Sequence, residues 1–393
     1  MADRKEAAAD VQALNAEPGL TAEQALIRAA DHGIHQMPVP TPFAVGRVNC
    51  YLIEDEPLTM VDAGPNSDRA LAELERHLAE HDRRLEEIEL ILLTHNHLDH
   101  VGLVGTVVER SGAEVAALGI GAERLANFDT DRELEDAFAV ELMLRHGIPE
   151  STVMPLREIS RSFQSFGAPA RVTRPLADGE TVELAQRSLR VLHRPGHSPM
   201  DTLFEDAELG HVLCGDHLLA RISSNPLLSR PLAEVAQEAG RAGAIGEAGG
   251  DSAAATGRSR ALVAYLESMR ATAEMSAELF LPGHGEPITE HRALIADRIA
   301  KHERRKEKIF GLIGEGRRTA YEIAQSLWGN VAVTQAFLCL SEVIGHTDLL
   351  VAEGRLAEID DGERAHFEPI ADPLASAAGE RQADGGAQTE GGA

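Results

Sequence analysis

The sequence has little cysteine, few basic side chains and no long apolar run. The three cysteines, Cys50, Cys214 and Cys339, are far apart and form no Cys-x-x-Cys pair. We therefore interpret them as small buried apolar side chains of a protein from a reducing compartment. No run approaches the roughly 18 apolar residues that a membrane helix needs, and the charged N-terminus lacks the apolar segment of a signal peptide. We expect a cytoplasmic protein with no membrane segment.

Acidic side chains clearly outnumber basic ones. The chain has 64 Asp and Glu against 37 Lys and Arg, which gives a formal net charge of −27. Arginine supplies nearly all of the positive charge, because lysine occurs only at Lys5, Lys301, Lys306 and Lys308. Such a surface repels polyanions on average, although this average does not exclude a local basic patch.

The length of 393 residues predicts two to three domains, and an apolar content of 43% can fill a sizeable core. Residues 1–32 form a polar, Ala-rich extension with weak helical periodicity, and the main domain is expected at 33–300. Within it, the Ala/Gly-rich stretch 231–258 predicts a flexible insertion. A small helical domain is expected at 301–370, and the Gly- and acid-rich segment 371–393 predicts a disordered tail.

Short apolar runs and helical patterns alternate through the main domain. The run "IELILLTH" is a nearly continuous apolar stretch that ends at His95. A strand of this kind is covered on both faces, which is typical of a layered α/β core. A loop at the end of such a strand can present side chains from a rigid scaffold.

The segment "LTHNHLDHVG" places four potential metal ligands on one short turn. His95 and His97 are two positions apart, so both imidazoles point to one side if the segment is extended. Asp99 and His100 can then face a neighbouring position across the turn. The pattern predicts half of a metal site.

Further residues of ligand type follow other predicted strands. They are Asp62 in "VDAGP", His197 in "RPGHS", Asp216 in "CGDHL" and His284 in "LPGHGEP". A single histidine beside glycine is usually a turn residue, but so many ligand-type residues at strand-to-loop junctions together predict a metal centre.

The motif "THNHLDHVG" resembles the THxHxDHxG signature of the metallo-β-lactamase superfamily. The pieces "VDAG", "PGHS", "GDH" and "PGHG" stand in the family's order, and the resemblance covers about residues 33–300. It implies an α/β fold, a four-layered αββα sandwich with the metals at one edge between two sheets. One departure is Leu103, which stands where relatives often have a second glycine, and which removes no ligand.

The resemblance also implies a role for each motif residue. The residues that match the ligands of a first metal are His95, His97 and His197. Those that match the ligands of a second metal are Asp99, His100 and His284, with Asp216 as the bridge. Asp99 and Asp216 are also carried over as catalytic carboxylates. Asp62 matches an outer aspartate that orients the histidine loop.

Imidazoles and carboxylates without a thiolate suit zinc first, with iron or manganese as alternatives. We expect two divalent ions, which lower the pKa of a bridging water to about 7 and make hydroxide the nucleophile. The antibiotic-cleaving branch of the family uses a cysteine ligand, whereas Cys214 is interpreted as a buried strand residue. The oxygen-reducing diiron branch has a carboxylate where this chain has His97, which disfavours redox chemistry.

Three more side chains near the motifs are candidates for the substrate pocket. His193 and His217 lie beside ligands in the sequence and are either pocket or purely structural residues. Arg221 follows Asp216 by five positions and could meet an anionic group of a substrate.

Residues 302–368 have the predicted order helix, helix, helix, hairpin. Thr319 and Glu322 have the spacing of a capping box. The region resembles the winged-helix domain of a subgroup that includes glyoxalase II-like thioester hydrolases and lactamase-like endoribonucleases. Winged helices bind nucleic acid or serve as packing modules, so a homo-oligomer is possible. The basic run "KHERRKEKIFGLIGEGRR" is either a solvated helix face or a phosphate contact.

These observations predict a dinuclear metallohydrolase that attacks the carbonyl of a small acyl thioester or ester. The alternative is an endoribonuclease that cleaves single-stranded RNA, and a binding protein with purely structural metals is a third hypothesis. A thiolate leaving group has a pKa near 8.5 and departs without a strong general acid. No such acid is identifiable in the sequence, and this favours the thioester.

Overall fold

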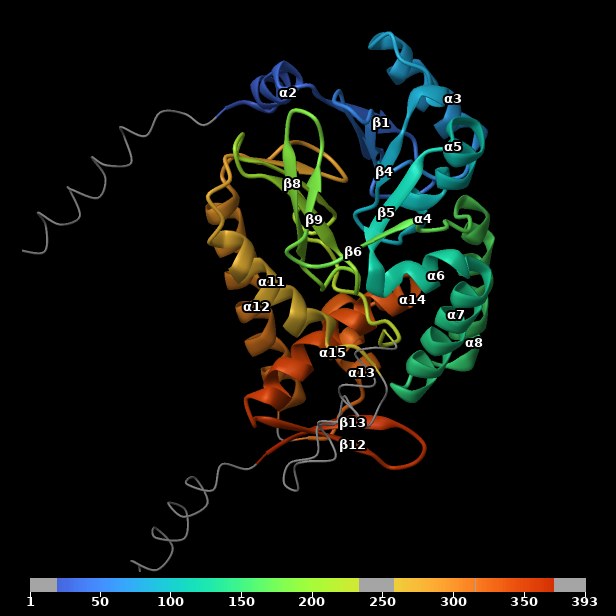
Figure 1. Cartoon of the computed structure of the whole chain (residues 1–393). Helices are drawn as coiled ribbons and strands as arrows, with labels where there is room; N and C mark the ends of the chain where they lie inside the picture. The colour runs from blue at the N-terminus through green and yellow to red at the C-terminus, as the bar shows by residue number, and fades with distance from the viewer. Residues whose placement is uncertain (1–19, 233–257, 315, 371–393) are drawn as a thin grey trace, which may run out of the picture.

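The computed structural model describes residues 20–232, 258–314 and 316–370. Two β-sheets lie face to face between layers of helices, and further helices close one end of the molecule (Figure 1). Most of the predicted insertion 231–258 and the whole predicted tail 371–393 lie outside the described residues.

The first sheet has six strands in chain order, antiparallel at its N-terminal edge and parallel from the third strand onward. The strands are β1 (Ile34–Val39), β2 (Val48–Ile53), β3 (Thr59–Val61), β4 (Leu90–Leu92), β5 (Glu114–Leu118) and β6 (Arg174–Leu176). All residues of β2, β3 and β4 are buried, and for β4 the continuous apolar run predicted this.

The second sheet has five strands in the order β11-β10-β9-β8-β7, with one parallel pair, β10 and β11. Its strands are β7 (Thr181–Glu183), β8 (Ser188–His193), β9 (Thr202–Asp206), β10 (His211–Gly215) and β11 (Leu279–Pro282). Side chains such as Val191, Phe204 and Leu213 join one buried apolar cluster with side chains of the first sheet. This shared core holds the two sheets together.

Helices cover the outer faces of the sheets. On the first sheet lie α2 (Ala22–Asp31), α3 (Asp68–Glu80) and α5 (Val104–Ser111), and on the second lie α11 (Ala261–Ala273) and the first part of α12 (His291–Ile313). The α/β fold expected from the motifs is present. The predicted extension 1–32 ends in α2, whose Ala25 and Ala29 are buried in the same core as the sheets.

A second apolar cluster lies outside the sandwich. It joins α7 (Phe128–Arg145) and α8 (Glu150–Phe163) to the C-terminal elements. These are α13 (Ala320–Trp328), α14 (Val331–Thr334), α15 (Ala336–Ala352), β12 (Leu356–Asp360) and β13 (Ala365–Pro369). Thr319 and Glu322 form the predicted capping box of α13.

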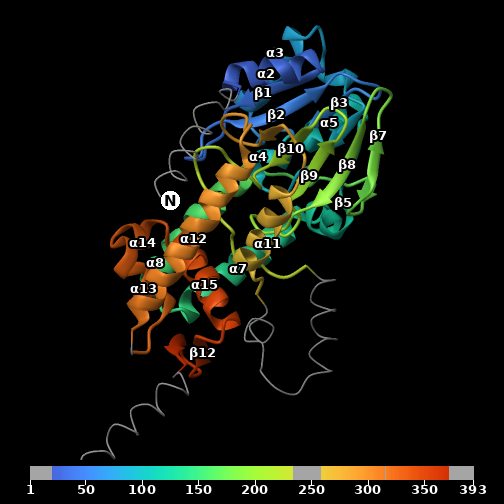
Figure 2. The same cartoon turned by 90° about the vertical axis from the view of Figure 1, so that its left-hand side faces the viewer.

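The helix α12 connects the two parts of the molecule. It extends from beside the sheets down to α13 (Figure 2), so the boundary predicted near residue 300 falls inside one continuous helix. Ile295 packs with the second sheet, and Ile309 and Ile313 pack in the C-terminal cluster. The element order of helices followed by a hairpin agrees with the sequence, while the identification as a winged helix stays a prediction.

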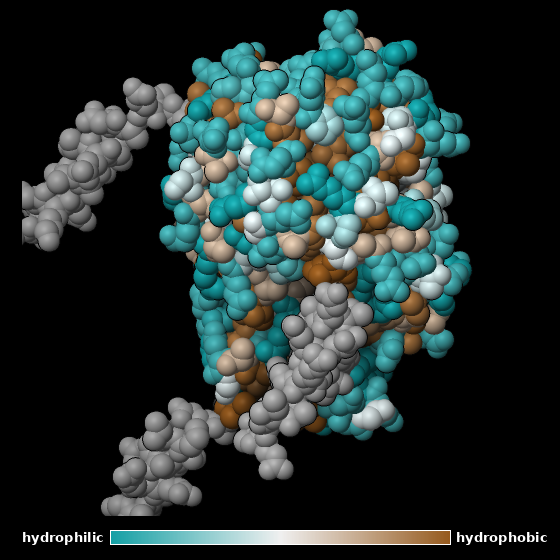
Figure 3. All heavy atoms as spheres, in the orientation of Figure 1, coloured by the Kyte–Doolittle hydropathy of each residue, from teal (hydrophilic) through white to brown (hydrophobic). Residues whose placement is uncertain are grey.

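The surface seen in Figure 3 is mostly hydrophilic, with apolar side chains in small groups. Inside the protein, Arg258 and Asp348 form a buried ion pair. The guanidinium of Arg258, just before α11, donates hydrogen bonds of 2.6 and 2.7 Å to the carboxylate of Asp348 in α15. None of the helices in the described ranges combines the length and the apolar character that a membrane crossing requires.

Candidate metal centre

The predicted ligands lie on loops at one edge of the sandwich, where strands of both sheets end. The loop with His95, His97 and His100, which includes the short helix α4 (Leu98–Val101), follows β4 of the first sheet. His197, Asp216 and His284 follow β8, β10 and β11 of the second sheet. Backbone bonds join the two sets of loops at this edge: Thr202 N–H donates to Thr94 O across 2.8 Å, and Asn49 N–H donates to Gly283 O across 2.7 Å.

All seven predicted ligands meet in one cluster. Three overlapping groups have ligand atoms within 4.8 Å of one another. They are His95 with His97 and His197, His95 with His100 and Asp216, and Asp99 with His100 and His284. Because the groups share His95 and His100, they form one continuous site.

Four ligand atoms of this cluster have no hydrogen-bond partner. They are Nε2 of His95, His100 and His284, and Oδ1 of Asp216, all of them buried. Buried polar atoms are normally satisfied, because an unpaired one costs free energy. Nitrogen and carboxylate oxygen atoms gathered without partners fit a pair of divalent cations.

Hydrogen bonds on the far side of the imidazole rings fix how the rings point. His100 Nδ1–H donates to Asp62 at 2.7 Å. His284 Nδ1–H donates to the backbone oxygen of Arg47 at 2.8 Å, and His197 Nδ1–H to that of Asn225 at 3.1 Å. In His100 and His284 the Nε2 atom is thereby left for the cluster, as is usual for metal-binding histidine. Nε2 of His197 lies 3.0 Å from Nδ1 of His97, another predicted ligand.

Asp62 anchors the histidine loop in the way its predicted role requires. Its carboxylate accepts hydrogen bonds from Thr94 N–H at 2.9 Å and from the Thr94 hydroxyl at 2.7 Å, besides the bond from His100. The residue is buried and has φ +57°, a left-handed conformation that is costly for a residue other than glycine. Such strain is retained where the surrounding contacts enforce it.

Two motif glycines are required by close approach. A Cβ on Gly283 would lie 2.4 Å from Asp216 Oδ1, and a Cβ on Gly102 would lie 2.2 Å from the backbone nitrogen of Asn66. Leu103, which departs from the family pattern, is buried, and its N–H donates to Gly64 O at 3.0 Å. The turn after His100 is therefore closed without a second glycine.

Electrostatics divide the cluster into two halves. Burial, together with the neighbouring His197, lowers the pKa of His97 to about 3. Burial also opposes protonation of His100, but Asp62 and Asp216 outweigh it and raise the pKa of His100 to about 9. Asp216 and Asp99 raise the pKa of His284 to about 11 against burial. The carboxylates thus give this half a negative potential that favours cations.

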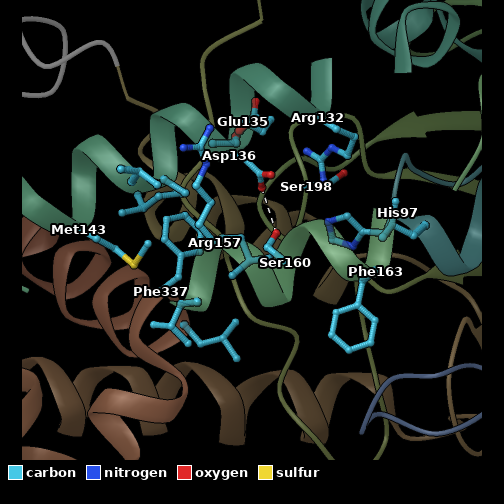
Figure 4. Close-up of a pocket in the computed structure, with 18 of the residues that line it drawn as sticks. His97, Arg132, Glu135, Asp136, Met143, Arg157, Ser160, Phe163, Ser198 and Phe337 are labelled. Carbon is cyan, nitrogen blue, oxygen red and sulfur yellow. Dashed lines mark hydrogen bonds between the residues drawn. The ribbon is translucent and has the colours of Figure 1, made fainter. Parts of the chain in front are cut away.

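A cavity of about 530 Å³ opens on the cluster at His97 and His197 (Figure 4). Its walls come from α7, α8, residues 227–229 and the start of α15, and more than half of the lining side chains are apolar. The volume is in the range typical of small-molecule pockets.

None of the three further pocket candidates lines this cavity. His193 Nε2–H donates to Pro199 O at 3.0 Å, and His217 Nε2 lies 2.9 Å from the Thr272 hydroxyl. The structural interpretation of these two histidines fits these bonds. Arg221 is exposed and forms a 2.6 Å ion pair with Glu286.

Two functional candidates were missed by the sequence. Arg132 of α7 and Arg157 of α8 line the cavity, yet both sit in helices that carry no recognisable motif. Cys214 lies outside the ligand groups found in the described residues. It is buried, with Sγ 3.6 Å from the backbone oxygens of Leu218 and Leu281, in agreement with its interpretation as a strand residue.

Comparison with known proteins supports the same family. Residues 44–284 match the metallo-beta-lactamase superfamily. The chain is 32% identical over 332 residues to the probable metallo-hydrolase YqjP of Bacillus subtilis, which covers 84% of this chain and 96% of that one. It is 26% identical over 184 residues to the hydroxyacylglutathione hydrolase GloC of Haemophilus influenzae, covering 45% and 69%.

Solved structures give the same result. The metallo-beta-lactamase family protein TTHA1429 of Thermus thermophilus aligns with a TM-score of 0.67 and 29% identity, covering 86% of this chain and 99% of that one. A beta-lactamase domain protein of Burkholderia ambifaria aligns with a TM-score of 0.66 and 25% identity, covering 86% and 91%.

Proposed function

Because this chain belongs to the metallo-beta-lactamase superfamily and is a metal-dependent hydrolase, we propose that it hydrolyses a small acyl thioester or a related ester. The observation that carries the proposal is the cavity beside His97 and His197, whose lining is mainly apolar. An apolar pocket suits an acyl group, whereas a nucleic-acid site needs cations along its length. The similarity to a hydroxyacylglutathione hydrolase supports the same choice.

The metal ligands and the residues around them have different roles in the proposed reaction. Two divalent ions held by the cluster would lower the pKa of a bound water to about 7 and polarise the oxygen under attack. Asp216 lies between the two halves, with Oδ2 3.4 Å from His284 Nε2 and 3.6 Å from His197 Nε2. Asp62 keeps His100 in the orientation that presents Nε2.

Neither of the two carboxyl groups that line the cavity is arranged as a free proton donor. Glu135 pairs with Arg124 at 3.0 Å, and Asp136 accepts a hydrogen bond from Ser160 at 2.9 Å. A thiolate leaving group tolerates this arrangement, because its pKa near 8.5 lets it depart without a strong acid. A ribose oxygen is far more basic and would need a donor.

The basic run near residue 301 also argues against RNA. Most of its cations are used in ion pairs within the protein, which are Lys301–Asp297, Arg305–Glu342, Lys306–Glu353 and Arg317–Asp361. We propose that the C-terminal region, predicted to be a winged helix, shapes the substrate pocket, since Ala336, Phe337 and Leu338 line it.

A side-by-side assay at physiological salt tests the proposal. Acyl-thioester hydrolysis should exceed cleavage of single-stranded RNA in kcat/KM, and His197→Ala should abolish it. The control is Arg304→Glu/Arg305→Glu, which reverses charge on the basic run and should leave thioester hydrolysis intact. RNA cleavage that collapses in this control, without any thioesterase activity, would establish the endoribonuclease alternative.

A further inference from the structure

Much of the cavity wall is built from apolar side chains of three helices. These side chains are Val140 and Met143 of α7, Leu156 and Phe163 of α8, and Phe337 and Leu338 of α15. All of them except Met143 are partly exposed. A ligand that covers this wall with carbon would gain the free energy of apolar burial.

Two arginines interrupt the apolar wall. In Figure 4, Arg132 is drawn on the side of His97, and Arg157 on the side of Met143 and Phe337. Within the described part of the chain, neither guanidinium has an ion-pair or hydrogen-bond partner. The Nε of Arg157 is moreover buried and unpaired. A guanidinium next to apolar side chains is costly unless it meets an anion.

The acids of the same cavity do not satisfy these arginines. Glu135 is paired with Arg124, and Asp136 accepts hydrogen bonds from Ser160 at 2.9 Å and from Gln164 at 2.8 Å. The bond between Asp136 and Ser160 is drawn in Figure 4. The cavity of this acidic protein therefore has an apolar wall, two carboxylates that are already paired or hydrogen-bonded, and two arginines that are not.

We infer that the cavity binds an acyl substrate with an apolar chain of medium length and one anionic group. The chain packs among α7, α8 and the start of α15, and the anion binds Arg132 or Arg157. This inference rests on the proposed function and adds the class of substrate to it.

The chemistry of the anion is a carboxylate or a phosphate, both of which a guanidinium binds through two parallel hydrogen bonds. A carboxylate would be part of the acyl chain. A phosphate would be part of the thiol to which the acyl group is attached. The two sources differ in where the charge lies, so matched ligands can separate them.

Binding of thioethers that cannot be hydrolysed tests the inference without turnover. The ligands are S-ethyl and S-decyl N-acetylcysteamine, which are neutral, S-decyl coenzyme A, which carries phosphates, and an S-decyl N-acetylcysteamine with a carboxylate at the chain end. Titration calorimetry on the metal-loaded protein should show affinity rising about fourfold for each added methylene until the cavity is filled. At least one anionic ligand should bind roughly ten- to a hundredfold more tightly than its neutral counterpart.

Variants assign these effects to residues. Arg132→Gln or Arg157→Gln should remove the preference for the anionic ligand and leave binding of the neutral decyl thioether unchanged. Phe337→Ala should weaken decyl binding and leave ethyl binding unchanged. Arg221→Gln is the matched control, because Arg221 lies outside the cavity and pairs with Glu286, and it should change nothing.

Equal affinity for the ethyl and decyl thioethers would overturn the apolar part of the inference. An anion preference that is absent, or that survives in both single variants and in the double variant, would overturn the role of the arginines. Hydrolysis of the corresponding thioesters is measured in parallel. Binding as expected without hydrolysis would refute the proposed function alone, and hydrolysis without chain-length or charge preference would refute this inference alone.

Discussion

The Nδ1 atom of His100 lies 2.7 Å from Oδ2 of Asp62, and both side chains are buried. The same carboxylate accepts two hydrogen bonds from Thr94, at the start of the histidine loop. One aspartate therefore holds both a ring and the turn that carries it, so its removal should disturb the metal site without removing a ligand.

Asp62→Asn should weaken metal affinity about 10- to 100-fold, because an amide lacks the charge that stabilises and orients the imidazole. Metal competition with a chelator measures this. Asp82→Asn is a matched control, since Asp82 also has a positive φ, of 55°, but is exposed. Equal metal affinity in the Asp62 variant and the wild type would contradict the anchoring role.

Asp216→Ala should lower the metal content from about two ions per chain to one or fewer and should abolish turnover. The residue joins the two halves of the cluster, with its carboxylate near His100, His197 and His284. Elemental analysis after gentle purification gives the stoichiometry. A wild-type protein with one ion or fewer, unchanged in the variant, would refute a dinuclear centre.

Cys214→Ser should keep its metal and measurable activity. Burial raises the pKa of the Cys214 thiol, so the residue is protonated and is a poor metal ligand. Its Sγ contacts the backbone oxygens of Leu218 and Leu281, which a serine hydroxyl can also reach. Metal loss measured by elemental analysis would show that the cysteine is a ligand.

Stability should fall as the pH drops below 6.5. Burial lowers the pKa of His146 to about 3 and of His302 and His346 to about 4, against 6.5 in an unfolded chain. Above pH 6.5 all three are neutral in both states and their contribution is complete. Between pH 6.5 and about 4 these histidines are protonated only in the unfolded chain. Each histidine therefore lowers the free energy of unfolding by up to about 1.4 kcal/mol per pH unit.

The variant His146→Gln tests how much His146 contributes to this loss of stability with falling pH, because it removes one titrating group from the C-terminal cluster. Urea unfolding from pH 7 down to pH 5 should show a shallower loss of stability in the variant than in the wild type. Both proteins carry the same metal ligands, so acid release of metal affects the two equally. Identical slopes would mean that the pKa of His146 is not lowered in the folded protein.

A chain shortened to end near residue 300 should retain metal if it stays soluble, because every predicted ligand precedes residue 285. The cut removes Ile309 and Ile313 of α12 and uncovers the apolar sides of α7 and α8. Aggregation is therefore expected unless these surfaces are made polar. Metal loss from a well-folded shortened chain would show that the C-terminal region supports the site directly.

The sequence was sufficient for the metal cluster and for the α/β fold. Histidine and aspartate at strand ends carry a strong signal, because their types and spacing are needed for metal binding. The bonds from His197 to Asn225 and from His284 to Arg47 could not be foreseen, since backbone oxygens carry no sequence signal.

The residues that form the walls of the cavity could not be predicted from the sequence either. Arg132 and Arg157 line a cavity that α7 and α8 form together with the C-terminal helices, and these are long-range contacts. The domain boundary predicted near residue 300 falls within α12, and the sequence gives no sign of this for a related reason. Helical periodicity in α12 is the same on both sides of the point where its partners change.

The first turn of α15 lines the cavity at Ala336, Phe337 and Leu338, while every predicted ligand lies far earlier in the chain. On the proposed function, part of the substrate pocket is thus encoded in a segment separate from the one that supplies the metal ligands. Divergence within these three positions can retune specificity in evolution without the loss of a catalytic centre, and a mutant library aimed at new substrates should be directed there.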